Sequence, residues 1–401
     1  LEMRRETFAT EADPRVENNQ LIGGEFGSSR GDRTSAEFYI ESLVPIVASE
    51  NSIAEPVIEA NISLRASQYS DFGSEANPKL AMRYRPNSDL MLRSSISKGF
   101  RVPSLFELNQ TDSVSQAFLV DPCSNPENVG LLRGCDVQAD PLRVQYLTVT
   151  GGNPELNPEI SKNLSLGFIY TPPGLRNFTF GLDAYRIEVD NIIGASGQFF
   201  LDQNAADLSF SERIIRDESG EVVRIVANNE NLGRREILGF DADISWRVFI
   251  AKWGSLGVDL SGSHIHSYQR QSAPTAEVQE LAGTFVDEAA EGSGALPKWK
   301  ARLNLFWQFG RWEVALSSFR VSSLTETVNS PNSHRDAGDW SREDAQMSYH
   351  FNSGESLVTL GVDNIFNQAP PFLASAFNDN FDSRTYESTG RFFYARFSHH
   401  L

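Results

Sequence analysis

Long stretches in which apolar and polar residues alternate constrain the fold of this chain most strongly. From Phe240 to Ile250 every second residue is apolar, and most of the residues between are polar or charged. The same two-residue period recurs over 299–309, 58–66 and 36–46. Successive side chains of a β-strand point to opposite faces, so this period predicts strands with one apolar and one mostly polar face.

The number and length of these segments favour a membrane barrel. Strands are expected over residues 2–12, 34–47, 57–71, 79–85, 90–101, 160–171, 177–191, 237–250, 255–268, 298–309, 312–325, 341–351, 357–367 and 390–401. Most of these fourteen segments have 11–15 residues, whereas strands of soluble sheets usually have about 5–6. About 9–11 tilted residues cross a bilayer. The mean hydropathy is only −0.33, and the sequence has no run of 18 apolar residues, which excludes a transmembrane helix. A barrel is not excluded, because its strands merely alternate.

The connections between these strands alternate in length. Short turns are expected at 86–89, 172–177, 251–254, 310–311 and 352–355, and long polar segments at 102–159, 192–236, 269–297, 326–340 and 368–389. Tight turns on one side and long loops on the other are typical of outer-membrane barrels, with the turns periplasmic and the loops extracellular. Aromatic residues cluster beside the short turns: Trp246, Trp253, Trp307, Phe309 and Trp312. They predict a girdle at the headgroup level, although tryptophans that cap a soluble sheet are an alternative.

Charge and cysteine content narrow the partners and the compartment. The net charge is −18, and a diffuse acidic surface repels phosphate backbones, so nucleic acid is not expected as a partner. Cys123 and Cys135 lie in a segment rich in Asp, Pro, Asn and Gly. We expect them to form a disulfide that closes one local loop, which favours an oxidising compartment.

Four motifs, in order along the chain, resemble those of TonB-dependent outer-membrane receptors: Ser97–Ser104 (SKGFRVPS), Gly152–Glu159 (GNPELNPE), Gly361–Asn367 (GVDNIFN) and Gly390–Phe397 (GRFFYARF). Paired cysteines in the loop after the first motif also occur in some members. The chain departs from the family at its end, where His399 and Leu401 stand in place of the usual aromatic residues.

The resemblance implies an all-β fold, an antiparallel transmembrane barrel. Residues 1–401 would form the C-terminal portion of a 22-stranded barrel, and a chain that begins at Leu1 is expected to be processed or a fragment. The plug, about eight further strands and the segment that binds the TonB energy-transducing complex would lie outside it. The implied function is TonB-dependent uptake of a scarce nutrient, such as a ferric siderophore or an oligosaccharide, across the outer membrane of a Gram-negative bacterium. Besides TonB, the expected partners are the small-molecule or oligosaccharide ligand and outer-membrane lipid.

Candidate ligand contacts are aromatic residues in otherwise polar loops, together with an arginine that ends a strand at the outer rim. They are Tyr146, Phe199, Phe200, Trp340, Phe372, Phe377 and Arg101. Aromatic faces stack on sugar rings or catecholate groups, but the same rings could pack loop against loop. The predicted inward-facing charges are expected mainly to pair with one another along the wall: Glu37, Glu41, Glu59, Arg65, Arg93, Asp241, Asp243, Arg247, Asp259, Lys298, Lys300 and Arg302.

The sequence carries no motif of the common enzyme classes. It has no nucleophile elbow, Walker loop, dinucleotide fingerprint or zinc-hydrolase motif, so neither an enzyme nor a cofactor is expected. His264 and His266 share a strand face, and residues 378–382 are rich in side-chain oxygens, but neither pattern suffices to predict a metal site. Two other functions stay open, a passive porin-like channel and a surface β-sheet adhesin.

Overall fold

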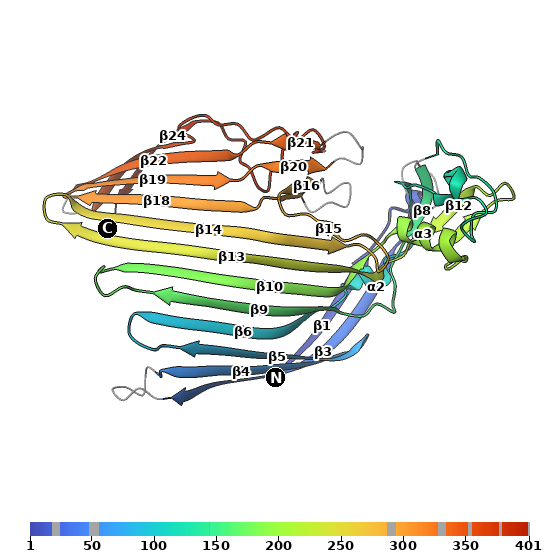
Figure 1. Ribbon diagram of the computed structural model, residues 1–401, viewed down its shortest axis with the longest axis horizontal. Helices are drawn as coiled ribbons and strands as arrows, with labels where there is room; N and C mark the ends of the chain where they lie inside the picture. Colours follow the sequence, from blue (N-terminus) through green and yellow to red (C-terminus); the bar gives the residue numbers. More distant parts are fainter. Residues whose placement is uncertain are drawn as a thin grey trace.

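The computed structural model describes residues 1–17, 25–47, 56–143, 145–286, 294–327, 334–351, 355–376 and 379–399. Fourteen long or medium strands dominate it (Figure 1). They are β1 (Glu2–Thr10), β3 (Ser29–Val47), β4 (Ile58–Tyr69), β5 (Gly73–Tyr84), β6 (Leu90–Arg101), β9 (Glu159–Tyr170), β10 (Phe178–Gly194), β13 (Glu230–Ile250), β14 (Gly254–Gln271), β18 (Trp299–Phe309), β19 (Trp312–Val321), β22 (Trp340–Phe351), β23 (Ser356–Asp363) and β24 (Phe392–His399). Each of the fourteen predicted strands is present. No helix in the described ranges is long and apolar enough to cross a bilayer.

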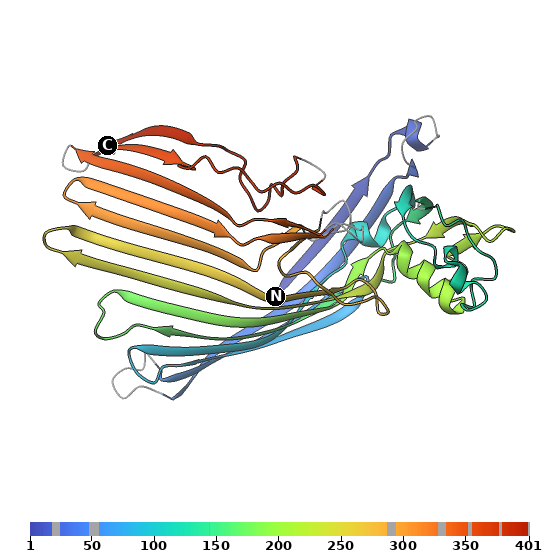
Figure 2. The ribbon, with the colours of Figure 1, turned by 45° about the horizontal axis from the view of Figure 1, so that its top comes forward.

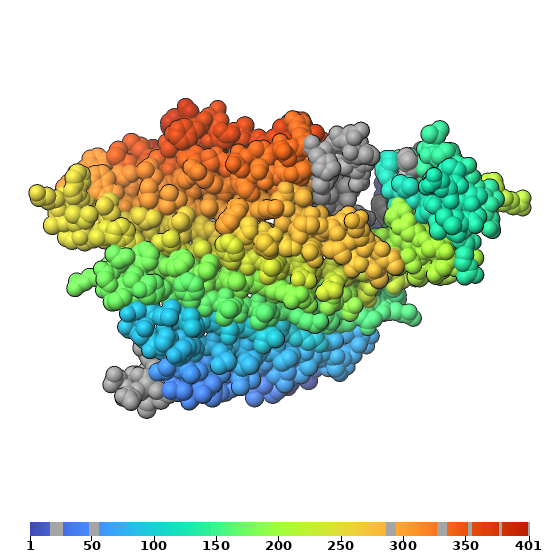
Figure 3. All heavy atoms as spheres, in the orientation of Figure 1, coloured from blue at the N-terminus to red at the C-terminus, as the bar shows by residue number. Residues whose placement is uncertain are grey.

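These strands form one antiparallel sheet in which each pairs with the next, from β1 at one end to β24 at the other. A short strand, β15 (Gln279–Glu280), pairs with β14 at the end of that strand that lies away from its tight turn. We call this the outer end of the strands. The sheet is strongly curved (Figure 2), and in the space-filling view adjoining strands form a wall (Figure 3). The antiparallel all-β prediction is therefore confirmed.

The register separates the sheet into two faces, as the alternation predicted. Ile244, Leu260 and Leu303 are directly opposite one another in one row across β13, β14 and β18. The neighbouring row, on the other face, holds Asp243, Ser261 and Arg302. We call these the apolar and the polar face. Leucines of the apolar face are exposed across the sheet, and soluble proteins rarely expose such a surface.

The long connections fold into structures of their own. One small sheet has the order β11 (Ile214–Arg216), β12 (Val222–Val226), β8 (Gln145–Thr150), β7 (Ser113–Phe118), β2 (Glu25–Phe26). With α3 (Gly197–Asp207) it forms the loop domain, which lies beyond α2 (Leu105–Asn109) at one end of the molecule (Figure 1). A second small sheet has the order β17 (Gly294–Leu296), β16 (Thr284–Val286), β20 (Leu324–Thr327), β21 (His334–Ala337). The tight turns, such as β13 to β14, lie at the opposite end.

Candidate functional site

The polar face carries several ion pairs that bridge neighbouring strands. Glu59 accepts from Arg83 at 2.7 Å, and Asp259 pairs with Arg247 at 2.6 Å. These contacts lie between strands that pair directly, so opposite charges meet side by side and stabilise the register. The expected mutual pairing of inward charges is seen at these positions.

One ion pair of this face spans an intervening strand. Arg93 on β6 forms a two-pronged contact with Asp183 on β10, although β9 runs between them. The residue of β9 directly opposite both is Gly167. A Cβ there would lie 2.1 Å from the Asp183 Oδ1 atom. The contact therefore requires glycine at this position. The reason is that glycine has no side chain to block the contact, and not that it has a more flexible backbone.

Arg101 connects the rim of the sheet to the first long loop. Its guanidinium donates to Glu159 at 2.6 Å and to Glu107 at 3.0 Å. Glu107 also accepts from the backbone N–H of Ser104 at 2.6 Å and so completes a capping box for α2. Burial raises the pKa of the Glu107 carboxyl, but the hydrogen bonds from Arg101 and Ser104 and the Arg101 charge outweigh it and hold that pKa below its ordinary value. Arg101 thus fixes α2 to β6 and β9, and a ligand role for it stays a prediction.

Three of the predicted aromatic residues lie in the cores of the loop sheets. Tyr146 is 0% exposed and, with Phe200, belongs to the core of the loop domain, where Phe199 packs against it. Trp340 is 3% exposed and lies edge-on to Tyr386, with ring centroids 5.5 Å apart, in the core of the second small sheet. In this conformation these rings pack loop against loop.

Phe372 differs from these rings because it is 52% exposed. The guanidinium of Arg335 lies 4.7 Å from its ring centroid, which is within the distance of a cation–π contact. Phe377 lies outside the described residues.

An arginine pair that sequence reasoning missed lies at the outer end of the polar face. Arg235 on β13 is directly opposite Arg270 on β14. Like charges in directly opposite positions repel. The Arg235 guanidinium lies 5.6 Å from the ring centroid of Tyr268, its Nε is buried without a hydrogen bond, and no carboxylate in the described part of the chain pairs with it. Arg270 donates to Gln279.

We call Arg235, Arg270 and the underlying Tyr268 the arginine site. Glu280 of β15 fixes the backbone beneath it. Its carboxylate accepts from the backbone N–H groups of Tyr268 at 2.7 Å and Ala282 at 3.0 Å. Tyr268, Leu281 and Ala282 form a small buried cluster. Because the loop is fixed to the strand in this way, the buried Tyr268 ring supports the Arg235 guanidinium from below, and the two guanidinium groups form a preorganised cationic surface. Such a surface suits an anion.

Counting residues outward from the tight turn of the β13–β14 hairpin comes within one residue of predicting this arginine pair. The Ile250 and Gly254 partners flank the tight turn, and counting outward from them would place Arg235 opposite Gln269. A bulge between residues 238 and 239 shifts the register by one residue and brings Arg270 opposite instead.

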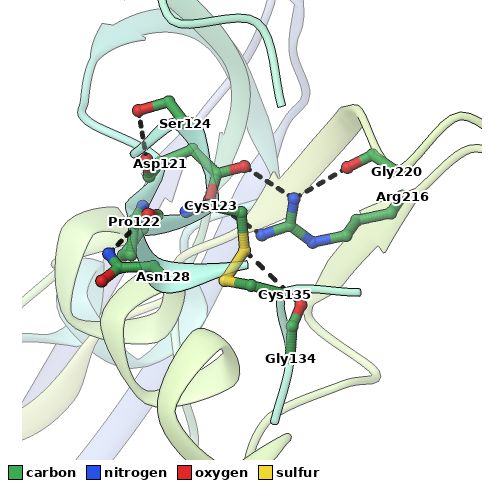
Figure 4. The surroundings of a disulfide bond; sticks show 9 residues. All are labelled: Asp121, Pro122, Cys123, Ser124, Asn128, Gly134, Cys135, Arg216 and Gly220. Carbon is green, nitrogen blue, oxygen red and sulfur yellow. Dashed lines mark hydrogen bonds and ion pairs between the residues drawn. A yellow bond between two sulfur atoms is a disulfide. The ribbon is translucent and has the colours of Figure 1, made fainter. Parts of the chain in front are cut away.

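The tip of the loop domain is closed by covalent and ionic links. Cys123 and Cys135 form a disulfide (Figure 4). Beside it, the buried Asp121 carboxylate pairs with Arg216 at 2.6 Å, and Arg216 also donates to the Gly220 carbonyl at 2.9 Å. The disulfide loop is thereby fastened to the β11–β12 hairpin.

The register places His264, the first of the two histidines, away from the polar face. His264 is on the apolar face, directly opposite Phe240 and Trp299. Its ring centroid is 4.0 Å from that of Trp299, and its Nδ1 atom is 3.0 Å from the Lys298 carbonyl oxygen. His264 is therefore part of an aromatic cluster near the outer end of the strands.

A curved antiparallel sheet of long strands, with an exposed apolar face and an ion-paired polar face, defines the wall of a transmembrane β-barrel. The chain belongs to the TonB-dependent receptor-like β-barrel family, whose sequence profile matches residues 5–365. No curated protein sequence matches the chain significantly. Members of this family are receptors and transporters rather than enzymes.

Solved structures with the same fold include three iron-related receptors. The siderophore receptor PirA from Acinetobacter baumannii is 14% identical, with a TM-score of 0.64 over 92% of this chain and 46% of its own. A mutant of the ferric enterobactin receptor PfeA from Pseudomonas aeruginosa is 16% identical, with a TM-score of 0.63 over 93% and 45%. The iron transporter FrpB from Neisseria meningitidis is 12% identical, with a TM-score of 0.56 over 96% and 48%. This chain thus spans about half the length of each.

Proposed function

We propose that this chain is the C-terminal barrel portion of an outer-membrane receptor that takes up an anionic ferric siderophore with energy from TonB. A plug and further strands would be supplied by the rest of the protein. Family membership and the siderophore receptors among the structural neighbours support this function. The observation that carries the choice of ligand is the Arg235 and Arg270 pair beside Tyr268.

The arginine pair favours an anionic ligand over a neutral sugar. Two guanidinium groups on directly opposite residues repel each other, and an anion between them removes the repulsion and adds charge-assisted hydrogen bonds. The buried Tyr268 ring holds the Arg235 guanidinium in place for such an anion, for example a catecholate group. A neutral oligosaccharide would leave the Arg235 charge without a counter-charge from the described part of the chain. Phe372 and the other loop aromatics stay predicted contacts.

The test compares two adjacent arginines on opposite faces. Arg235→Ala removes the proposed contact, and Arg234→Ala is the matched control, because Arg234 faces away and pairs with Asp190 at 3.4 Å. Hydrogen bonds to charged groups contribute about 1.5–3 kcal/mol. We therefore expect Arg235→Ala to weaken the binding of ferric enterobactin by the complete receptor roughly 10- to 150-fold, measured by fluorescence quenching. The control should stay within about twofold.

Equal affinities of the two variants would reject the arginine site as the place of ligand binding.

The passive-channel alternative is tested separately, by conductance measurements in planar bilayers. Steady ion conductance by the complete protein without TonB would favour it over gated uptake. The intact mass of the native protein tests the proposed domain arrangement. A mass of about 45 kDa, equal to the 44.6 kDa of this chain, would contradict the proposal that a plug and further strands lie outside the chain.

A further inference from the structure

A cavity of about 760 Å³ lies beside the tight turn between β5 and β6. It is bordered by residues just before β4, by the first residues of β6 and by the end of β9. We call the end of the strands at the tight turns the inner end. The side chains that matter for its chemistry are Val57, Arg85, Asp89, Met91 and Ile169.

The register places this cavity on the polar face. One row of that face crosses β4, β5, β6 and β9 and consists of Glu59, Arg83, Arg93 and Gly167. The next row toward the turns, two residues further along each strand, consists of Val57, Arg85, Met91 and Ile169. Side chains two residues apart on a strand share a face, so this inner row also belongs to the polar face.

The inner row differs in chemistry from the row next to it. There, Glu59 pairs with Arg83 at 2.7 Å, and Arg93 pairs with Asp183. In the inner row three of the four side chains are apolar, and the Arg85 side chain has no hydrogen bond or ion pair within the described ranges. A guanidinium is weakly hydrated, so beside an apolar surface it is a ready donor for an anion.

The acid that lines the cavity is engaged within the turn. The Asp89 carboxylate accepts from the Ser88 hydroxyl at 2.8 Å, and the Asp89 carbonyl accepts from the backbone N–H of Thr171 at 2.7 Å. The Asn87 side chain accepts from the backbone N–H groups of Asp89 and Leu90 at 3.0 and 2.9 Å. These bonds fix the turn to β9, so the wall of the cavity is preformed.

The size and lining of the cavity define the class of ligand. Sites for small molecules have volumes of about 300–1,000 Å³ and are mostly apolar, with a few polar groups that orient the ligand. Here the apolar surface comes from Val57, Met91 and Ile169, and the free cation is Arg85. A ligand with flat or apolar surfaces and a negative charge satisfies both. A neutral polar ligand would leave the guanidinium without a counter-charge.

We propose that this inner cavity is a second binding site for the transported anion, occupied between its passage along the wall and its release at the inner end. The inference rests on the proposed uptake of an anionic ferric siderophore. Arg85 donates hydrogen bonds to an anionic group of the cargo, and Met91 and Ile169 lie against its rings. Passage is faster over several sites of moderate affinity than over one tight site. A cargo that leaves the neutralised row therefore next meets a free guanidinium.

The test counts binding sites on the complete receptor in detergent, where both ends are open to solution. The probe is ferric enterobactin, titrated by calorimetry into protein whose folding is checked by heat-dependent gel mobility. We expect the wild type to bind a second molecule. Arg85→Ala should weaken that second molecule roughly tenfold or more. Met91→Trp, which fills the cavity and keeps the charge, should weaken it as well.

The matched control is Arg311→Ala, which removes an exposed arginine from another tight turn at the inner end. It should bind both molecules like the wild type. A neutral ferric trihydroxamate should not occupy the inner site.

Three results would overturn the proposal: a single site in the wild type, a second site unchanged by Arg85→Ala, or equal occupancy by the neutral complex. A single site that is lost in Arg235→Ala would leave the proposed function standing and reject the inner site alone. Absence of all binding by the wild type would contradict both.

Discussion

Replacing Leu303 by arginine tests which face of the sheet meets lipid. Leu303 lies on the apolar face of β18, directly opposite Leu260 on β14. It is four residues from Trp299 and four from Trp307 on the same strand, or roughly 14 Å from each ring position. Aromatic girdles mark the two edges of the apolar band of a barrel, so Leu303, midway between the tryptophans, is at the middle of that band.

The expected cost follows from this depth. An arginine on the lipid face of a barrel costs about 2–4 kcal/mol at the bilayer midplane and much less near the headgroups. Because 1.4 kcal/mol is a factor of ten, Leu303→Arg should lower the folding equilibrium constant roughly 30- to 700-fold. The neighbouring Asn304 faces the other way, opposite Asp259 and Ser317. Asn304→Arg should therefore change stability by no more than about 1 kcal/mol.

The assay is folding of the complete protein into lipid vesicles in a urea titration, followed by tryptophan fluorescence and by heat-dependent gel mobility. Leu303→Arg should shift the midpoint to much lower urea, and Asn304→Arg should stay near the wild type. A similar shift for both variants would refute the assignment of the two faces, because adjacent strand residues would then share one environment.

Three further outcomes are expected. Gly167→Ala should destabilise the barrel by about 1–3 kcal/mol in the same titration, because its Cβ would lie 2.1 Å from a carboxylate oxygen, whereas Gly181→Ala, with nothing nearer than 3.9 Å, is the control. Replacing Cys123 and Cys135 by serine should destabilise the loop domain by roughly 2–4 kcal/mol and speed its proteolysis; unchanged cleavage would contradict this. The lowered pKa of Glu107 means that its contribution to stability is complete above its ordinary value of 4.5 and is lost as the pH falls through the lower folded value. The protection factors of the α2 amides, which are corrected for the intrinsic pH dependence of exchange, should therefore fall in acid in the wild type but stay unchanged over that pH range in Glu107→Gln.

The strands were predictable from sequence because a bilayer imposes one period on every segment that crosses it. Where that constraint ends, prediction weakens. β13 begins at Glu230, before its predicted start at 237, because above the apolar band both faces are polar and the alternation disappears. β5 includes Pro78, which the prediction placed outside the strand. Pairing with β6 begins only at Lys79, so the proline lies where β5 has a free edge.

The loops and the candidate site were less predictable for a different physical reason. The small sheets consist of strands of 2–6 residues, too short to show a period. An aromatic residue in a polar segment can lie either on the surface or in a core. Only the packing of loops that are distant in sequence decides which of the two it does. That packing buries Tyr146 and Trp340 and leaves Phe372 exposed. The arginine pair depends on a one-residue bulge that sequence does not mark.

Under the proposed uptake function, the ion-paired wall would affect how long a charged cargo stays in the lumen. Arg93 with Asp183 and Arg247 with Asp259 are neutralised in place, so the wall presents dipoles rather than bare charges along these strands. Passage through a protein requires each contact to be weak enough to release. Under the proposed uptake function, a charged cargo would therefore dwell only briefly at these neutralised pairs, and tight capture would be left to unneutralised sites such as the arginine site.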